Sequence, residues 1–84
     1  MSSELTAFPP ERRIVGSSQV LRALRRGVRL RVFLARDADP SIVDPIAELA
    51  LGRGLRLEWV GSKEELGRMF GISRAAAAAA LIEG

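Results

Sequence analysis

The stretch GSSQVLRALRRGVRLRVFLA (residues 16–35) contains two different hydrophobic periods in succession. In residues 16–27 the apolar side chains recur three and four positions apart, which is the spacing of one face of an α-helix. In residues 28–35 they alternate with other side chains, which is the spacing of a β-strand. Gly27 is a favourable end for the helix because glycine accepts a left-handed conformation. The stretch therefore predicts a helix that leads directly into a strand, as in layered α/β domains.

The polar face of this predicted helix brings hydroxyl, amide and guanidinium groups together. At helical spacing, Ser18, Arg22 and Arg25 form one row, and Gln19, Arg22 and Arg26 form another. Backbone N–H groups without helical partners lie in the first turn, where the positive end of the helix dipole favours a phosphate. The pattern favours contact with RNA. Its alternative interpretation is a helix cap followed by an ordinary solvated face.

The composition is that of a small basic domain. The chain has 84 residues, with 13 Lys and Arg against 10 Asp and Glu, and we expect one domain with a compact core. Twelve of the basic residues are arginine, whose planar set of donors suits phosphates and guanine edges. A GC-rich genome would also raise the arginine count. The positions of the arginines therefore carry the argument, not their number.

Cysteine, histidine and tyrosine are absent from the chain. The first two absences exclude disulfides, thiolate metal sites and nucleophilic machinery of the Ser-His-Asp type. Asp37, Asp39, Ser41 and Glu48 have the spacing of a calcium loop, but Ile42 replaces the glycine of its sharp turn. We expect these acidic residues to end a strand and cap a helix instead. The sequence thus predicts no catalysis, no metal and no cofactor.

The remaining elements follow from hydrophobic and capping patterns. Further strands are predicted at residues 12–15 and 55–60, and helices at 39–51 and 62–70, after an extended lead-in over residues 1–11 that includes Pro9 and Pro10. Residues 12–84 then form the domain. Ser62 and Glu65 match a capping box. Pro45 either distorts its helix near Ser41 or moves the start of the regular part to Asp44.

Two aromatic residues are predicted to belong to the core. Phe33 and Trp59 each lie in a predicted strand among apolar neighbours. A packed position is therefore favoured over a stacking platform for RNA bases.

The six alanines of residues 75–80 are the hardest segment to assign. Alanine has the highest helix propensity, but an isolated run of this length does not hold a helix together. Because strands alternate with helices elsewhere, we predict a strand of small side chains in the crowded middle of a mixed sheet. The apolar run 75–82 is also too short to span a bilayer, and we expect a cytoplasmic monomer with no membrane partner.

Two alternative functions stay open at this point. A DNA-binding helix-turn-helix would occupy residues 66–81, although beyond Arg74 its second helix would offer only alanine methyl groups to the base edges. A protein-interaction module for ribosome assembly is the other alternative.

Several motifs occur in an order and spacing that resemble one protein family. They are residues 16–27, LARDADP at 34–40, Leu49-Ala50 with Gly54, and WVGSKEELG at 59–67 followed by Gly71-Ile72. Over residues 12–83 the set resembles the L7Ae/L30e ribosomal protein family, and most closely its small bacterial YlxQ-like or YbxF-like members.

The resemblance implies a three-layer α/β/α sandwich with a four-stranded mixed sheet. It also implies binding of kink-turn RNA, a sharply bent internal loop flanked by sheared G·A pairs, in ribosomal or regulatory complexes. Carried over by position, the RNA-binding residues are Gly16, Ser17, Ser18, Gln19, Arg22, Lys63, Ile72, Ser73 and Arg74. Residues 18, 19 and 22 would face the guanines, Lys63 would contact a phosphate, and residues 72–74 would form a base-contacting loop. Archaeal and eukaryotic family members usually carry Asn-Glu where this chain has the shorter Ser18 and then Gln19, and bacterial relatives tend towards Lys-Gln.

Overall fold

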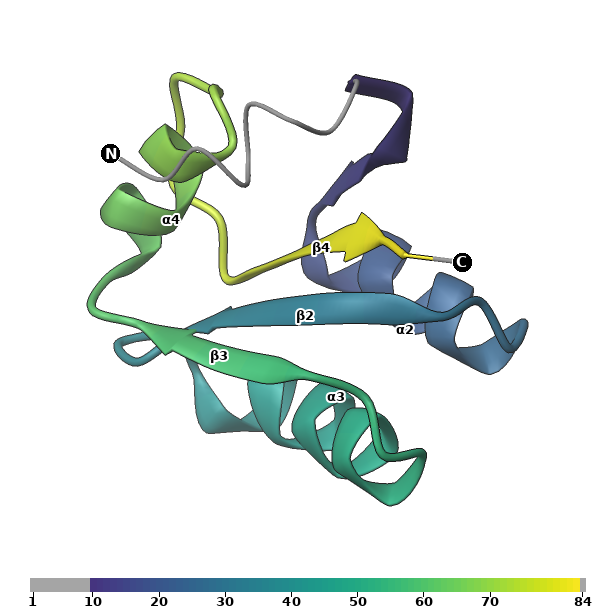
Figure 1. The fold of residues 1–84 in the computed structure, drawn as a ribbon. Helices are drawn as coiled ribbons and strands as arrows, with labels where there is room; N and C mark the ends of the chain where they lie inside the picture. The colour runs from purple at the N-terminus through teal and green to yellow at the C-terminus, as the bar shows by residue number, and fades with distance from the viewer. Residues whose placement is uncertain (1–9, 84) are drawn as a thin grey trace.

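Strands and helices alternate along residues 10–83, the part of the chain that the computed structural model describes (Figure 1). After a short 3-10 turn at Pro10–Arg12, the elements are β1 (Arg13–Val15), α2 (Ser17–Arg25), β2 (Leu30–Ala35), α3 (Pro40–Gly52), β3 (Leu57–Val60), α4 (Lys63–Met69) and β4 (Ala78–Ile82). The predicted order of elements is confirmed, with strand boundaries that differ by one to three residues.

The four strands form one mixed sheet in the order β1-β4-β2-β3. β2 and β3 are parallel, whereas β4 runs antiparallel to both of its neighbours, β1 and β2. β4 is the last strand in the sequence but lies in the interior of the sheet. The predicted four-stranded mixed sheet is therefore confirmed.

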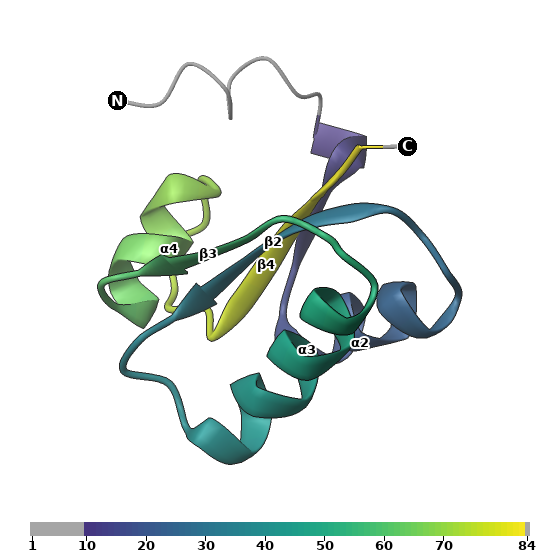
Figure 2. The ribbon, with the colours of Figure 1, turned by 60° about the horizontal axis from the view of Figure 1, so that its bottom comes forward.

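The sheet lies between two layers of helices, with α2 and α3 on one face and α4 on the other (Figure 2). Successive side chains of β2 point to opposite faces of the sheet, so β2 packs against both helix layers. Leu30 is paired with Ile82, which lines a hollow together with residues of α2, so this side of β2 faces α2 and α3. Phe33 points the other way and meets Phe70, just after α4, edge-to-face with ring centroids 5.4 Å apart. The expected three-layer sandwich is thus confirmed, and so is the buried position of Phe33.

The alanine run supplies the buried part of β4. Ala78, Ala79 and Ala80 are fully buried, because β4 has a strand on each side and helices on both faces of the sheet. The predicted strand is confirmed but lies further along the chain, since it begins at Ala78 and the preceding alanines form a connection. The helix-turn-helix alternative is wrong, because the segment that would be its recognition helix is a connection followed by an interior strand.

The core prediction for Trp59 is wrong, since this side chain is 41% exposed. Trp59 lies on β3, which is at the edge of the sheet and has a neighbouring strand on one side only. At the other end of the chain, Pro10 and Glu11 belong to the 3-10 turn rather than to an extended lead-in. Residues 1–9 of that predicted lead-in, which include Pro9, lie outside the described residues.

α3 begins at Pro40 and continues through Pro45 to Gly52. Asp39 caps it, because its Oδ1 accepts hydrogen bonds from both the backbone N–H and the hydroxyl of Ser41, each 2.9 Å long. The alternative in which regular helix begins only at Asp44 is therefore wrong, since a strong cap and a proline in the first turn start the helix earlier. Within residues 10–83, no helix combines the length and apolar character needed to cross a membrane.

Candidate nucleic-acid interface

The C-terminal ends of β1, β2 and β3 lie beside the start of β4 at one end of the sheet. The N–H of Gly16, just after β1, donates to the carbonyl of Ala78 at 2.9 Å, and the N–H of Ala35 donates to the carbonyl of Ala77 at 3.0 Å. The N–H of Arg36, just after β2, donates to the carbonyl of Val60 at the end of β3. The start of α2, the connection from β2 to α3, the start of α4 and the connection into β4 therefore converge. Predicted site residues come from three of these four segments.

The first turn of α2 leaves its backbone donors available. Gly16 is the N-cap residue, with φ +111°, and no side chain among residues 10–83 caps this helix start with a hydrogen bond. There is room for a β-carbon at this position, since it would meet only the Gln19 Cγ at an ordinary distance of 3.6 Å. Glycine is therefore favoured here by its positive φ and not by lack of space. Ser18 is exposed and does not act as a cap, and Gln19 beside it is also exposed. This turn presents N–H, hydroxyl and amide groups to a ligand.

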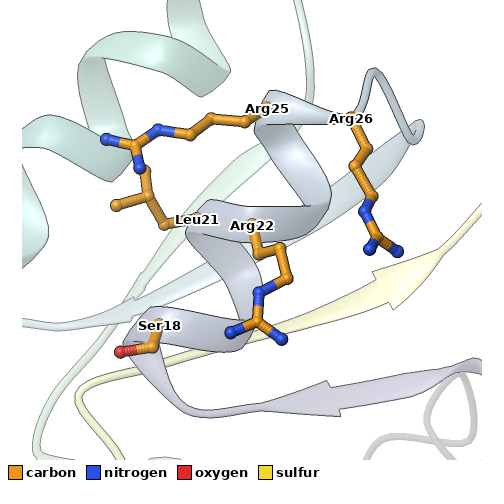
Figure 3. A pocket seen from close by; sticks show the side chains of 5 residues that line it. All are labelled: Ser18, Leu21, Arg22, Arg25 and Arg26. Atoms are coloured by element: carbon orange, nitrogen blue, oxygen red, sulfur yellow. The ribbon is translucent and has the colours of Figure 1, made fainter.

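The solvent face of α2 continues with arginines. Val20 and Leu24 are buried, whereas Arg22, Arg25 and Arg26 are exposed. Figure 3 shows the three guanidinium groups spread around the helix, with Arg25 directed towards α3 and Arg22 and Arg26 directed away from it. A shallow hollow of about 350 Å³ is lined by Ser18, Leu21, Arg22, Arg25 and Arg26. Arg22 thus stands one helical turn beyond Ser18 on a continuous polar surface.

Lys63 is fixed through its backbone and free at its side chain. Its N–H donates to Oδ1 of Asp37 at 2.8 Å, and its carbonyl accepts from the N–H of Ala76 at 3.0 Å. The Ser62 hydroxyl caps α4 by accepting from the N–H of Glu65, as the capping box predicts. The Lys63 side chain is exposed. Its ammonium group therefore emerges where three of the converging segments meet.

The carboxylate of Asp39 lies in the same region. The pKa of Asp39 is lowered by the hydrogen bonds from the Ser41 N–H and hydroxyl, and further by the positive charge of Lys63. Asp39 is therefore ionised at neutral pH. A nucleic acid at this end of the sheet would meet one negative group among the basic ones.

The connection from α4 to β4 carries the last three predicted residues. The N–H of Ile72 donates to the carbonyl of Gly67 at 3.0 Å, which holds Ile72 half-buried against α4. Ser73 and Arg74 are exposed and line, with Glu64 and Arg68, an open hollow of about 270 Å³. These residues lie on the α4 side of the sheet, opposite the layer that contains α2 (Figures 1 and 2). The structure thus brings residues 16–19 into contact with the start of β4 but keeps residues 72–74 on the other face.

Two further polar residues belong to this end of the sheet and were not among those predicted. Arg36 is exposed and follows β2 directly, and Ser41 lines a hollow of about 200 Å³ between α2 and α3 together with Ser17 and Ser18. The sequence contains a signal for Arg36, because a charged residue directly after a predicted strand marks that end of the sheet. The hollow between the helices depends on how α2 and α3 pack, and periodicity within one helix does not give that.

Comparison with known proteins identifies the family of this chain and agrees with its fold. The model of the Ribosomal protein L7Ae/L30e/S12e/Gadd45 family matches residues 6–84. The chain belongs to this family. Among family relatives, an RNA-binding protein of Geobacillus sp. (strain WCH70) is 42% identical over 69 residues, which cover 82% of this chain and 84% of the relative. An RNA-binding protein of Caldanaerobacter subterraneus subsp. tengcongensis is 36% identical over 75 residues, or 89% of this chain and 92% of the relative.

Longer proteins and solved structures extend the comparison. The large ribosomal subunit protein eL8 of Haloquadratum walsbyi is 35% identical over 69 residues, which are 81% of this chain but 58% of eL8. The structure of the 15.5kD RNA binding protein of Giardia lamblia superposes with a TM-score of 0.78 at 24% identity, covering all of this chain and 78% of that one. The latter similarity is one of fold. The family resemblance predicted from the sequence motifs is confirmed.

Proposed function

We propose that this L7Ae family member is a non-catalytic cytoplasmic protein that recognises kink-turn RNA in ribosomal or other translation-associated complexes. The observation that carries the proposal is the first turn of α2. It combines backbone N–H groups that have no partner among the described residues with the exposed Gln19 amide and, one turn further, the Arg22 guanidinium. The relatives named RNA-binding protein and eL8 support an RNA partner and a ribosomal setting.

The donors at this turn match the chemistry of exposed guanines. The guanidinium of Arg22 has the geometry to donate two hydrogen bonds to O6 and N7 of one guanine, and the Gln19 amide offers both a donor and an acceptor. In regular A-form RNA these edges lie in a deep, narrow groove that side chains do not reach. A kink with sheared G·A pairs opens that groove. The proposed mechanism is therefore recognition of a bent shape, with a few guanine contacts at α2.

Phosphates and unstacked bases would be contacted from the other converging segments. The exposed ammonium of Lys63 is suited to a phosphate, and the first turn of α2 offers a second phosphate position at its positive dipole end. Ile72, Ser73 and Arg74 would contact unstacked bases from the α4 side. The RNA would then bend around the end of the sheet, which suits a kinked molecule better than a straight duplex.

A binding titration at fixed salt tests this function with three nucleic acids. They are a kink-turn RNA, the same RNA with its G·A pairs replaced by Watson–Crick pairs, and a DNA duplex. We expect the intact kink to bind roughly tenfold or more tightly than the others, since one bidentate arginine–guanine pair contributes about 1–3 kcal/mol of discrimination. Equal weak binding to all three would contradict the proposal and favour a protein partner. Preference for the DNA would contradict it as well.

A further inference from the structure

We propose that the second half of α2 binds the phosphate backbone of a helical stem that flanks the kinked RNA element. The residues are Arg25, which ends α2, and Arg26, its C-cap residue, which together we call the distal arginines. The inference rests on the proposed function and extends it, because neither residue belongs to the guanine-contacting turn. α2 rises about 1.5 Å per residue, so the distal arginines continue the surface by roughly 12 Å beyond Ser18.

The charge distribution of the described residues singles out this surface. Residues 10–31 contain seven arginines and one acidic residue, whereas residues 32–83 contain six basic and eight acidic residues. α2 itself contains no acidic residue. Among residues 10–83, no ion pair or side-chain hydrogen bond involves either distal arginine. Both guanidinium groups are therefore available to an external anion.

The shape of the surface fits a backbone that passes over it. The hollow of about 350 Å³ extends from Ser18 to the distal arginines, and a second hollow of about 300 Å³ lies between α2 and Ile14 of β1, with Arg26 and Gln19 at its rim. Arg22 and Arg26 line both hollows and point away from α3, whereas Arg25 points towards it (Figure 3). Guanidinium groups thus flank the exposed face of α2 on both sides. This arrangement matches the phosphates of an RNA stem laid along α2.

The same features argue for RNA rather than an acidic protein. A protein interface is anchored by buried aromatic or large apolar side chains, but the large exposed apolar residues of this structure are Ile42, Leu49, Leu51 and Trp59, and none lies on α2. The distal arginines are also continuous with the turn proposed to read guanines, since Ser18 lines the same hollow. A stem attached to the kink would leave the first turn of α2 along this surface.

The test uses the full chain and three RNAs that share one kinked core. One RNA has both flanking stems cut short, and in each of the others one stem is extended by a helical turn. Dissociation constants are measured from 50 to 200 mM salt for the wild type, Arg25→Gln, Arg26→Gln and the control Arg56→Gln. Arg56 is exposed, lies just before β3 at the edge of the sheet farthest from β1, and lines neither of the two hollows beside α2, so the control removes the same charge elsewhere. Circular dichroism checks that the exposed substitutions leave the fold intact.

We expect the wild type to bind one extended RNA more tightly than the short one and with a steeper salt dependence. Each distal substitution should reduce the slope of log K against log salt on that RNA by about one. When the salt is raised from 50 to 200 mM, the factor by which affinity falls should therefore be roughly threefold smaller for the variant than for the wild type. The short RNA should show no such difference, and Arg56→Gln should behave as the wild type. If the wild type prefers the kink but the distal variants keep its slope and stem-length gain, the inference is wrong while the proposed function stands. If the titration against the RNA with Watson–Crick pairs, described under the proposed function, shows no preference of the wild type for the kink, both fail.

Discussion

A β-carbon placed on Gly67 would lie 2.0 Å from the carbonyl oxygen of Arg74. Gly67 is inside α4 and has no left-handed backbone, so its glycine is required by space and not by conformation. The connection that carries Ile72, Ser73 and Arg74 crosses α4 at this point, where the helix has no side chain. The position of the proposed base-contacting residues therefore depends on one missing methyl group.

Gly67→Ala should destabilise the protein by about 1–3 kcal/mol, the usual cost of overpacking, because a backbone atom must move to admit the methyl group. RNA affinity should fall as well, since residues 72–74 are displaced. Urea unfolding and a binding titration measure the two effects. Gly52→Ala is the matched control, because no atom lies within 4 Å of the position that its methyl group would take, and it should retain full stability. A Gly67→Ala variant as stable as Gly52→Ala would disprove the close approach.

Arg22→Ala should weaken binding of kink-turn RNA by about 1–3 kcal/mol and reduce discrimination against the RNA with Watson–Crick pairs, because a bidentate guanine contact is lost. A phosphate contact alone would behave differently, since its removal weakens binding to both RNAs alike and mainly changes the salt slope. Titrations of the two RNAs by the wild type, Arg22→Ala and Arg22→Lys distinguish these outcomes. Unchanged affinity of Arg22→Ala would remove Arg22 from the site.

The Asp39 cap should make stability depend on pH at the acidic end. Hydrogen bonds from Ser41 lower the pKa of Asp39 in the folded state. The carboxylate therefore stabilises the fold above the unfolded carboxyl pKa of about 4, and this contribution is lost as the pH falls through the lower folded value. Asp39→Asn retains a capping side chain but does not titrate. The stability difference between wild type and Asp39→Asn, from urea unfolding, should shrink below about pH 4. A constant difference across that range would contradict the role of the charge.

Larger side chains should not be tolerated in the interior strand. Ala80 is fully buried and is paired with Ile14 on one side and Val32 on the other. Ala80→Leu should therefore cost about 1–3 kcal/mol or more through overpacking. Ala75 belongs to the same alanine run but is exposed before the strand begins, and Ala75→Leu should be nearly neutral. Thermal unfolding of both variants compares them, and similar melting temperatures would show that the two alanines share an environment.

Local periodicity was sufficient to predict α2, β2 and their order. The outward faces of α2 also followed from spacing, so Ser18, Gln19 and Arg22 were predicted as exposed. The alanine run shows where that information ends. Ala75 and Ala80 are the same residue in the same run, and only the hydrogen bonds of Ala77 and Ala78 to segments far back in the chain decide where the strand begins.

The remaining differences depend on strand order, which no single segment encodes. Trp59 has the alternating neighbours of a core strand, but β3 lies at the sheet edge because β4 takes the interior position beside β2. The same topology places residues 72–74 on the opposite face from α2. Arg36 follows β2, and the same strand order places it at the end of the sheet where the start of α2, the start of α4 and the start of β4 lie together. These placements required the three-dimensional structure.

The position of β4 has a consequence for folding during translation. Among the strands of residues 10–83, β1 pairs with β4 alone, and the Arg12 guanidinium is directed to the carbonyl of Ile82, 70 positions away. While the chain is being translated, β1 and α2 therefore leave the ribosome long before the strand that joins them to the rest. Closure of so long a loop is also a slow step in folding. The surface around Gly16 is thus assembled only after β4 has been synthesised, and RNA would select molecules with a complete sheet over shorter nascent chains.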